Sequence, residues 1–458
     1  MDRRYICNLG YIMKYFLENT NDIDRSSYIW NMAGSMLNAF QSVIFLMILT
    51  RVVGLMEAGV FTIAYADANL FLNIGKYGMR YYQVSDVKQQ YSFNAYKRSR
   101  YITTLLMFIV SLLFLLYTAN VNSYSMHKSL VILWMCLFKM VDSIEDVFHG
   151  RLQQEGRLDI ASKMLTLRTF STILVWTAVL IITDDQMWAT AIGTIYTCLC
   201  FLWMMWLVSD CLHPGADATM DCIGKLADRT GQYCNSVGSL LRVTFPLFIS
   251  TFLSFYIGNA QKYAIDAELS DQMQACYGFI AMPVFVVGLL NNFIFNPMIT
   301  ELSFMWDERD IRGFIKRSFV QMGIVFVITA LCLAGGWLIG IPVLSWIYST
   351  DLTPYKADLL ILLLGGGYLG LSGLLQTLIT IIRMQRYLAF GYGIIALLAL
   401  LLSNPVVRVY EIRGAAVLYL ILMAVLSVAF LGLFLWGVRK KSPQTEKEEA
   451  YQGSKNVQ

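Results

Sequence analysis

The sequence predicts an all-α, polytopic membrane protein with about twelve transmembrane helices. Apolar stretches as long as a bilayer is thick recur along the chain, for example at 102–117, 320–341 and 417–436. A helix needs about 20 such residues to cross about 30 Å of hydrocarbon. Only 14% of the 458 residues are charged, against about a quarter in soluble domains. A soluble core could not bury so many apolar stretches, so the chain is expected to span a membrane.

Apolar stretches with charged borders set the expected positions of the spans. The spans are expected near 27–50, 57–78, 101–119, 127–149, 162–183, 187–209, 237–260, 274–299, 318–344, 355–382, 387–407 and 414–437. About 25 mostly polar residues precede the first span. They lack the short apolar core and small-residue cleavage site of a signal peptide, so the first span is expected to be a retained anchor.

The connection at 210–236 is the longest and most polar of the chain. It is expected to be a cytoplasmic linker between an N-terminal lobe at 1–209 and a C-terminal lobe at 237–437. The polar stretch at 438–458 is expected to be a disordered cytoplasmic tail. Polar loops occupy equivalent positions in the two halves, which predicts two related six-helix lobes around a central cavity.

Lys and Arg gather in alternate connections, such as Lys97, Arg98 and Arg100 after the second span. The positive-inside rule places these connections, and therefore both termini, in the cytoplasm. The net charge of +4 is small and spread along loops, which does not favour nucleic-acid binding.

Cofactor chemistry finds no support in the sequence. The nine Cys are scattered without metal-ligand spacing, and the three His do not cluster. The chain also has no Gly-rich loop that ends in Lys-Ser or Lys-Thr to hold a nucleotide. We therefore expect no metal, no nucleotide and no other cofactor.

Polar side chains recur at helical spacing inside several spans, in both halves of the chain. Such stripes either form hydrogen bonds between packed helices or line a hydrated cavity. Because the stripes mix amides with cations, the cavity is favoured for the set as a whole. The candidate substrate contacts on these stripes are Asn31, Asn38, Asn69, Asn73, Lys76, Asn292 and Gln376.

Three further cations lie at or near the ends of spans, namely Arg51, Arg242 and Lys262. One interpretation is that they only reach for the membrane surface or mark topology. The other is that they line a basic cavity for an anionic group such as a phosphate or pyrophosphate, since Arg stays charged and can form paired hydrogen bonds.

The fourth span is the most charged, with Lys139, Asp142, Glu145 and Asp146 inside thirteen residues that read FKMVDSIEDVFHG. Lys139 and Asp142 can pair across one turn. A buried carboxylate here is a candidate to carry a coupling proton. The alternatives are an ion pair that locks this span to its neighbour and a helix end that emerges into the cytoplasm.

Four segments, at 50–86, 145–162, 246–266 and 340–356, resemble the polysaccharide transporter family, which comprises Wzx-type flippases of the multidrug/oligosaccharidyl-lipid/polysaccharide (MOP) flippase superfamily. The resemblance implies two six-helix lobes around a cavity. It also implies transfer of a polyprenyl-pyrophosphate-linked oligosaccharide from the inner to the outer leaflet. Membrane lipids, a polysaccharide polymerase and glycosyltransferases are the partners that such a role implies.

Two rival functions stay open at this point. An ion-coupled multidrug exporter of the same superfamily needs acidic and aromatic groups for organic cations, whereas the stripes here are mainly amide and basic. A membrane glycan polymerase or acyltransferase usually needs a large outer loop or a His/Asp pair, and only His127 is expected near the outer face. An enzyme is therefore not expected. A structural scaffold would leave the polar stripes unexplained.

Overall fold

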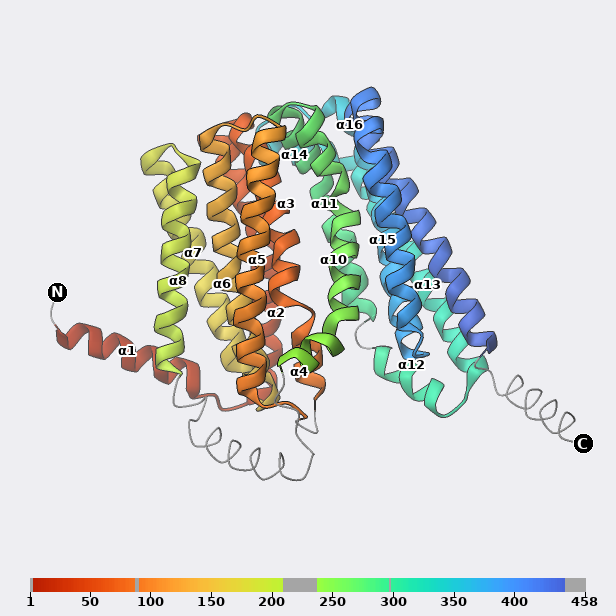
Figure 1. The fold of residues 1–458 in the computed structure, drawn as a ribbon, viewed down its shortest axis with the longest axis horizontal. Coiled ribbons are helices and arrows are strands. Elements are labelled where there is room, and N and C mark those ends of the chain that lie inside the picture. The colour runs from red at the N-terminus through yellow and green to blue at the C-terminus, as the bar shows by residue number, and fades with distance from the viewer. Residues whose placement is uncertain (1–2, 87–89, 209–236, 296–297, 441–458) are drawn as a thin grey trace, which may run out of the picture. The chain divides into compact units, whose positions relative to one another are not determined.

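The computed structural model describes residues 3–86, 90–208, 237–295 and 298–440. Over these ranges the chain is built of helices, without a strand, as Figure 1 shows. The predicted all-α class is confirmed. The helices form two compact units, Met1–Phe252 and Leu253–Gln458.

Unit 1 holds the first six predicted spans. Asp22, Ser92, Ser125 and Asp185 cap the starts of four of its helices by accepting a hydrogen bond from a backbone N–H of the first turn. The helices are α1 (Arg3–Glu18), α2 (Ile23–Val52), α3 (Leu55–Lys76), α4 (Met79–Ser85), α5 (Phe93–Val121), α6 (Met126–Gln154), α7 (Leu158–Thr183), α8 (Gln186–Leu207) and the first half of α10 (Val237–Glu268).

Helix α3 lies at the centre of unit 1 and packs against α2, α5 and α6. Small residues allow the close approach of helices inside a membrane. Near the end of α3, Gly75 lies directly against Ser143 of α6 and Met107 of α5. Its carbonyl oxygen also accepts hydrogen bonds from Arg100 (2.7 Å) and Thr103 (2.8 Å) of α5. Gly75 therefore fixes the contact of three helices at this end of the unit.

Unit 2 is organised around α15, which packs against α11, α13 and α16. Gly366 lies against Val284 of α11, and Gly367 lies against Thr329 of α13. The helices are the second half of α10, α11 (Asp271–Phe295), α12 (Met298–Asp307), α13 (Ile311–Gly335), a π-helical turn (Gly336–Gly340), α14 (Ile341–Tyr348), a 3₁₀ turn (Thr353–Tyr355), α15 (Lys356–Ile381) and α16 (Gln385–Lys440).

The described helices agree with the twelve predicted spans. Nine helical stretches of the described residues are long and apolar enough to cross a membrane. The last of them, α16, has two arms joined at Glu411, where the backbone is not helical, and these arms match the eleventh and twelfth spans. Helices α6 (29 residues) and α11 (25 residues) supply the remaining two. Helix α6 differs from the nine in its charged side chains.

The N-terminal segment contains an element that the sequence analysis does not predict. Residues 3–18, which precede the first span, form the amphipathic helix α1. The predicted linker at 210–236 and the tail beyond residue 440 lie outside the described residues. The predicted lobe boundaries therefore stay predictions.

We expect Gly75→Ala to lower the free energy of unfolding by about 1–3 kcal/mol, because the added methyl group would overlap Ser143 and Met107. Gly323→Ala in α13 is the matched control, since no atom from elsewhere in the described structure lies within 4 Å of its new methyl group. The control should be neutral or stabilising, as Ala is the better helix former. Thermal unfolding in detergent measures both, and equal effects would contradict the tight packing at Gly75.

Candidate functional site

A cavity of about 480 Å³ opens at one end of unit 1. The first residues of α2 and α7 meet the last residues of α3 and α6 there, because successive helices run in opposite directions. The lining residues are Asn31, Lys76, Gly78, Met79, Arg80, Val84, Asp146, Gln153 and Leu158. The structure thus brings three sequence-predicted site residues, Asn31, Lys76 and Asp146, to one place.

The turn between α3 and α4 positions the cations of this cavity. Tyr77 (φ 51°) and Gly78 (φ 62°) are both left-handed, a conformation that Gly adopts without strain. Helix α3 therefore ends at Lys76, and a new helix starts at Met79. Tyr77 stacks on Phe248 of α10 at 4.4 Å between ring centroids, which holds the turn against the first half of that helix. As a result Lys76 and Arg80 line the same space.

Asp146 is the carboxylate of the cavity, and it is already held by two arginines. Arg80 lies 3.4 Å from one carboxylate oxygen and donates a further hydrogen bond to Gln153 at 3.1 Å. Arg100, which is fully buried behind the cavity, donates to the other oxygen at 2.8 Å. Lys76 also interacts electrostatically with Asp146. Three cations therefore surround one carboxylate, which leaves two positive charges in excess (3 − 1 = 2).

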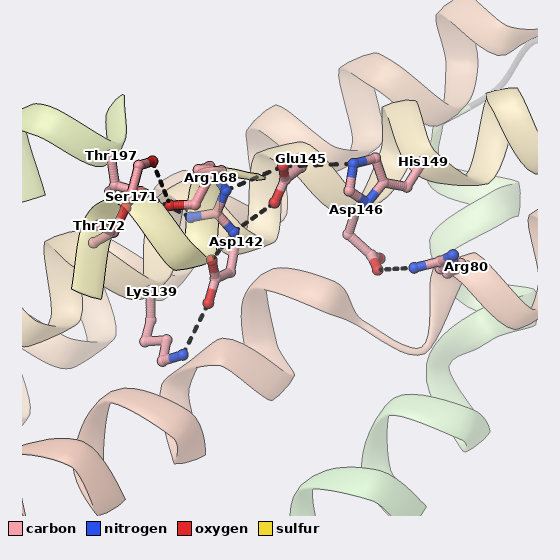
Figure 2. A network of polar contacts seen from close by, with 10 residues as sticks. All are labelled: Arg80, Lys139, Asp142, Glu145, Asp146, His149, Arg168, Ser171, Thr172 and Thr197. Atoms are coloured by element: carbon pink, nitrogen blue, oxygen red, sulfur yellow. Dashed lines mark hydrogen bonds and ion pairs between the residues drawn. The ribbon is translucent and has the colours of Figure 1, made fainter. Parts of the chain in front are cut away.

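Deeper in α6 lies a second group of charges, here called the buried ion network, which Figure 2 shows together with the contact between Asp146 and Arg80. Lys139 donates to Asp142 at 2.9 Å, across one helical turn as predicted. Arg168 of α7 donates to Asp142 at 2.7 Å and to both oxygens of Glu145 at 2.6 and 3.1 Å. The guanidinium also donates to Thr197 of α8 at 2.7 Å. This network locks α6, α7 and α8 together.

The two groups of charges differ in their balance. In the buried ion network, Lys139 and Arg168 match Asp142 and Glu145 one for one. His149 adds a contact to Glu145 at 3.5 Å. Such a balanced network keeps its buried charges satisfied and has a structural role. The excess of positive charge lies around the cavity. The Lys, Arg, Asn and Gln side chains that line it are hydrogen-bond donors suited to an anion such as a phosphate.

In unit 1, Asn38, Asn69 and Asn73 are not among the residues that line the cavity, and Asn292 and Gln376 belong to unit 2. The side-chain amides of Asn69 and Asn73 donate to carbonyls one turn earlier in α3, at 2.7 and 2.8 Å. Gln376 of unit 2 accepts a hydrogen bond from the Tyr392 hydroxyl at 2.7 Å. Asn38 is half-buried in α2. The side chain of Asn292 lies outside the described residues.

Of the three predicted span-end cations, Arg51 and Arg242 of unit 1 are not among the residues that line the cavity, and Lys262 belongs to unit 2. Arg51 is exposed in the last turn of α2, and twenty residues of helix separate it from Asn31 by about 30 Å. Arg242 is exposed on the first half of α10, and Lys262 is half-buried on its second half. Their substrate-binding role stays a prediction, as does the ion-coupling role of Asp142, Glu145 and Asp146.

Sequence reasoning missed the partners of the α6 carboxylates. Arg168 stands alone in the apolar stretch LTLRTFSTILVW, and an intramembrane cation of this kind is itself a signal of a buried partner. The sequence pattern indicates Arg100 only as part of a basic cytoplasmic connection, whereas in the structure it lies in the first turns of α5. Gln153 has no distinctive sequence signal.

Solved structures of low sequence identity share the fold. A multidrug resistance MATE family transporter of the MOP superfamily, in an inward-facing conformation, has a TM-score of 0.65 and 12% identity over 89% of this chain and 96% of its own. The lipid II flippase MurJ, in an inward closed conformation, has a TM-score of 0.64 and 13% identity over 92% of this chain and 90% of its own. The Vibrio cholerae MATE transporter VcmN, in its bent form, has a TM-score of 0.59 and 10% identity over 91% of this chain and 96% of its own. No curated protein matches the chain.

The chain therefore shares the fold of a MATE family transporter and of the flippase MurJ. The profile of the polysaccharide biosynthesis protein family matches residues 25–303, which is more than half of the chain. The chain belongs to the polysaccharide biosynthesis protein family.

We expect Arg168→Gln to cost about 3–5 kcal/mol of stability, because the carboxylates of Asp142 and Glu145 would stay buried without their shared cation. Arg317→Gln is the control, since its pair with Glu301 is about 43% exposed on both sides and is worth about 0–1 kcal/mol. Thermal unfolding and membrane protein yield measure the difference. A double variant, Arg168→Met with Glu145→Gln, should recover part of the lost stability. If the stability losses of the two single variants simply add in the double variant, the residues do not act as a network.

Proposed function

We propose that this protein is a flippase that moves a polyprenyl-pyrophosphate-linked oligosaccharide from the inner to the outer leaflet of a bacterial plasma membrane, for surface polysaccharide assembly. The family supports a role in polysaccharide biosynthesis. The observation that carries the proposal is the surplus of positive charge in the cavity of unit 1, around Lys76, Arg80 and Arg100. The diphosphate of such a substrate is the matching anion.

In this proposal the cavity receives the phosphate groups. Lys76 and Arg80 bind the phosphate oxygens, while Asn31 and Gln153 form hydrogen bonds to sugar hydroxyls that would otherwise lose their water. Arg100 keeps Asp146 engaged, so that this carboxylate does not repel the anion. The lipid tail stays in the bilayer. Rocking of the two halves then exposes the bound head group to the other side by alternating access, with both termini in the cytoplasm.

An ion-coupled exporter of organic cations is the alternative. Its cargo needs a carboxylate that is available to a cation. Asp142 and Glu145 share Arg168, and Asp146 is held by Arg80 and Arg100, so the cation-binding capacity of α6 is already used by the chain itself. The cavity would repel an organic cation. Drug sensitivity of a deletion strain distinguishes the two functions, and a strong gain in sensitivity with normal surface polysaccharide would favour the exporter.

An enzymatic function has less support. The family and the solved structures of the same fold are described as biosynthesis proteins, transporters and a flippase. His127 does lie 3.2 Å from Asp185, but Asp185 also caps α8 by accepting from the backbone N–H of Met187. Glu57 lies 3.8 Å from the other ring nitrogen of His127. These contacts join the starts of α3, α6 and α8, so they stabilise the packing of these helices.

We expect Lys76→Gln to reduce transport of a labelled lipid-linked oligosaccharide into the outer leaflet by about tenfold, because a charged hydrogen bond to phosphate is worth about 1.5–3 kcal/mol. The control is Arg408→Gln, which also removes one cation but lies in unit 2, is 72% exposed and pairs with Glu268. The measurement uses vesicles with equal amounts of each protein. Unchanged transport by Lys76→Gln would remove the cavity from the proposed function.

A second prediction concerns Arg242, which is exposed on the first half of α10. If it contributes to the substrate path, Arg242→Ala should lower delivery of the labelled glycan by severalfold, since a charge-assisted contact is lost. Delivery to the outer leaflet is measured at matched protein level. Normal delivery would restrict the phosphate-binding role to the cavity and leave Arg242 as a marker of topology.

A further inference from the structure

Helix α1 is a separate amphipathic element that the transport mechanism does not use. It is 16 residues long. Figure 1 shows that it crosses beside the end of α8, steeply inclined to α7 and α8, and extends away from the bundle. Its described side chains include Tyr11, Ile12, Tyr15 and Phe16, whose helical spacing gathers exposed apolar groups on one side of the helix. Among the described side chains, Lys14 lies on the opposite face.

One end of α1 is firmly fixed to unit 1. Leu17 is fully buried in a cluster with Ile160 of α7 and Met204 of α8. Lys163 of α7 donates to the carbonyl of Phe16 at 2.9 Å and to the Thr20 hydroxyl at 2.9 Å. Arg157 donates to the carbonyl of Glu18 at 2.9 Å. The helix is therefore held at the level where α7 begins and α8 ends.

The rest of the described part of α1 exposes large apolar side chains. Ile12 is 63% exposed and Tyr15 is 60% exposed. On α8, Leu202 (56%) and Trp206 (70%) are exposed just before the helix ends beside α1. A span shows such a surface to lipid, and Trp and Tyr favour the interface between lipid and water. The exposed face of α1 thus continues the lipid-facing surface of α8.

We propose that α1 lies in the head-group layer of the membrane, with Ile12 and Tyr15 toward the acyl chains and with the positively charged helix attracted to anionic lipid. Helix Arg3–Glu18 carries Arg3, Arg4 and Lys14 against a single carboxylate, Glu18, so it bears two positive charges in excess (3 − 1 = 2). Apolar burial and attraction to anionic lipid are the two contributions that bind such helices to a bilayer surface. The occupant of the exposed face is the bilayer itself.

The test places the photoreactive residue benzoylphenylalanine at position 12 of the full-length chain, and in a matched control at position 14. Both variants are reconstituted in vesicles of phosphatidylethanolamine and phosphatidylglycerol, irradiated, and analysed for lipid adducts by mass spectrometry. We expect about tenfold more lipid adduct at position 12 than at position 14, because the two positions lie on opposite faces. A third variant at Tyr15, whose exposed ring the reagent resembles, should also form lipid adducts.

Two outcomes would overturn the proposal. Equal lipid adducts at positions 12 and 14 would show that the helix does not lie with one face in the bilayer. Adducts mainly to a second copy of the chain, or to another part of the same chain, would show that protein covers this face. If the variant at position 12 fails to fold, the comparison of lipid adducts at positions 15 and 14 still tests the proposal, because the Tyr15 variant keeps an aromatic ring at an exposed position.

Discussion

The structure of unit 1 depends on the need to pair the charges of α6 inside the membrane. Helix α6 has the length of a span but carries three carboxylates, which hydrocarbon does not tolerate alone. Each of them obtains its cation from another helix, Arg168 from α7 for Asp142 and Glu145, and Arg100 from α5 for Asp146. These contacts are non-local, so they fix which helices lie beside α6. Gly75 then allows α3 to approach closely enough for Arg100 to reach its carbonyl.

Much of the fold follows from the sequence alone, because crossing a bilayer imposes a length and an apolar composition on every span. The pair of Lys139 and Asp142 was also predictable, since three residues of helix bring them together whatever surrounds them. The roles of Arg168 and Arg100 were not, because their partners lie 23 or more residues away in sequence. Helix α1 was missed for a related reason, as a short amphipathic helix has too few apolar residues to resemble a span.

For the candidate site, sequence reasoning found the right kinds of side chain but could not tell which of them meet. Asn31 and Lys76 lie 45 positions apart in sequence (76 − 31 = 45), and the opposite directions of α2 and α3 bring them into one cavity. Asn69 and Asn73 share the polar stripe with Lys76, yet their amides donate to the preceding turn of α3. A helical stripe therefore predicts a face, whereas the turns and the neighbouring helices decide what that face contacts.

The contrast between the two groups of charges leads to a mechanistic argument. The buried ion network is electrically balanced, so it gains nothing from a further ion and is suited to hold the helices in place. Around the cavity beside it, Lys76, Arg80 and Arg100 face the single carboxylate of Asp146, so two positive charges are in excess. A doubly negative ligand would remove that surplus. The loaded and empty states of this end of unit 1 would then differ in electrostatic free energy, and a ligand can shift a conformational equilibrium only through such a difference. A transporter whose cargo carries the balancing charge can therefore couple binding to movement without a cofactor.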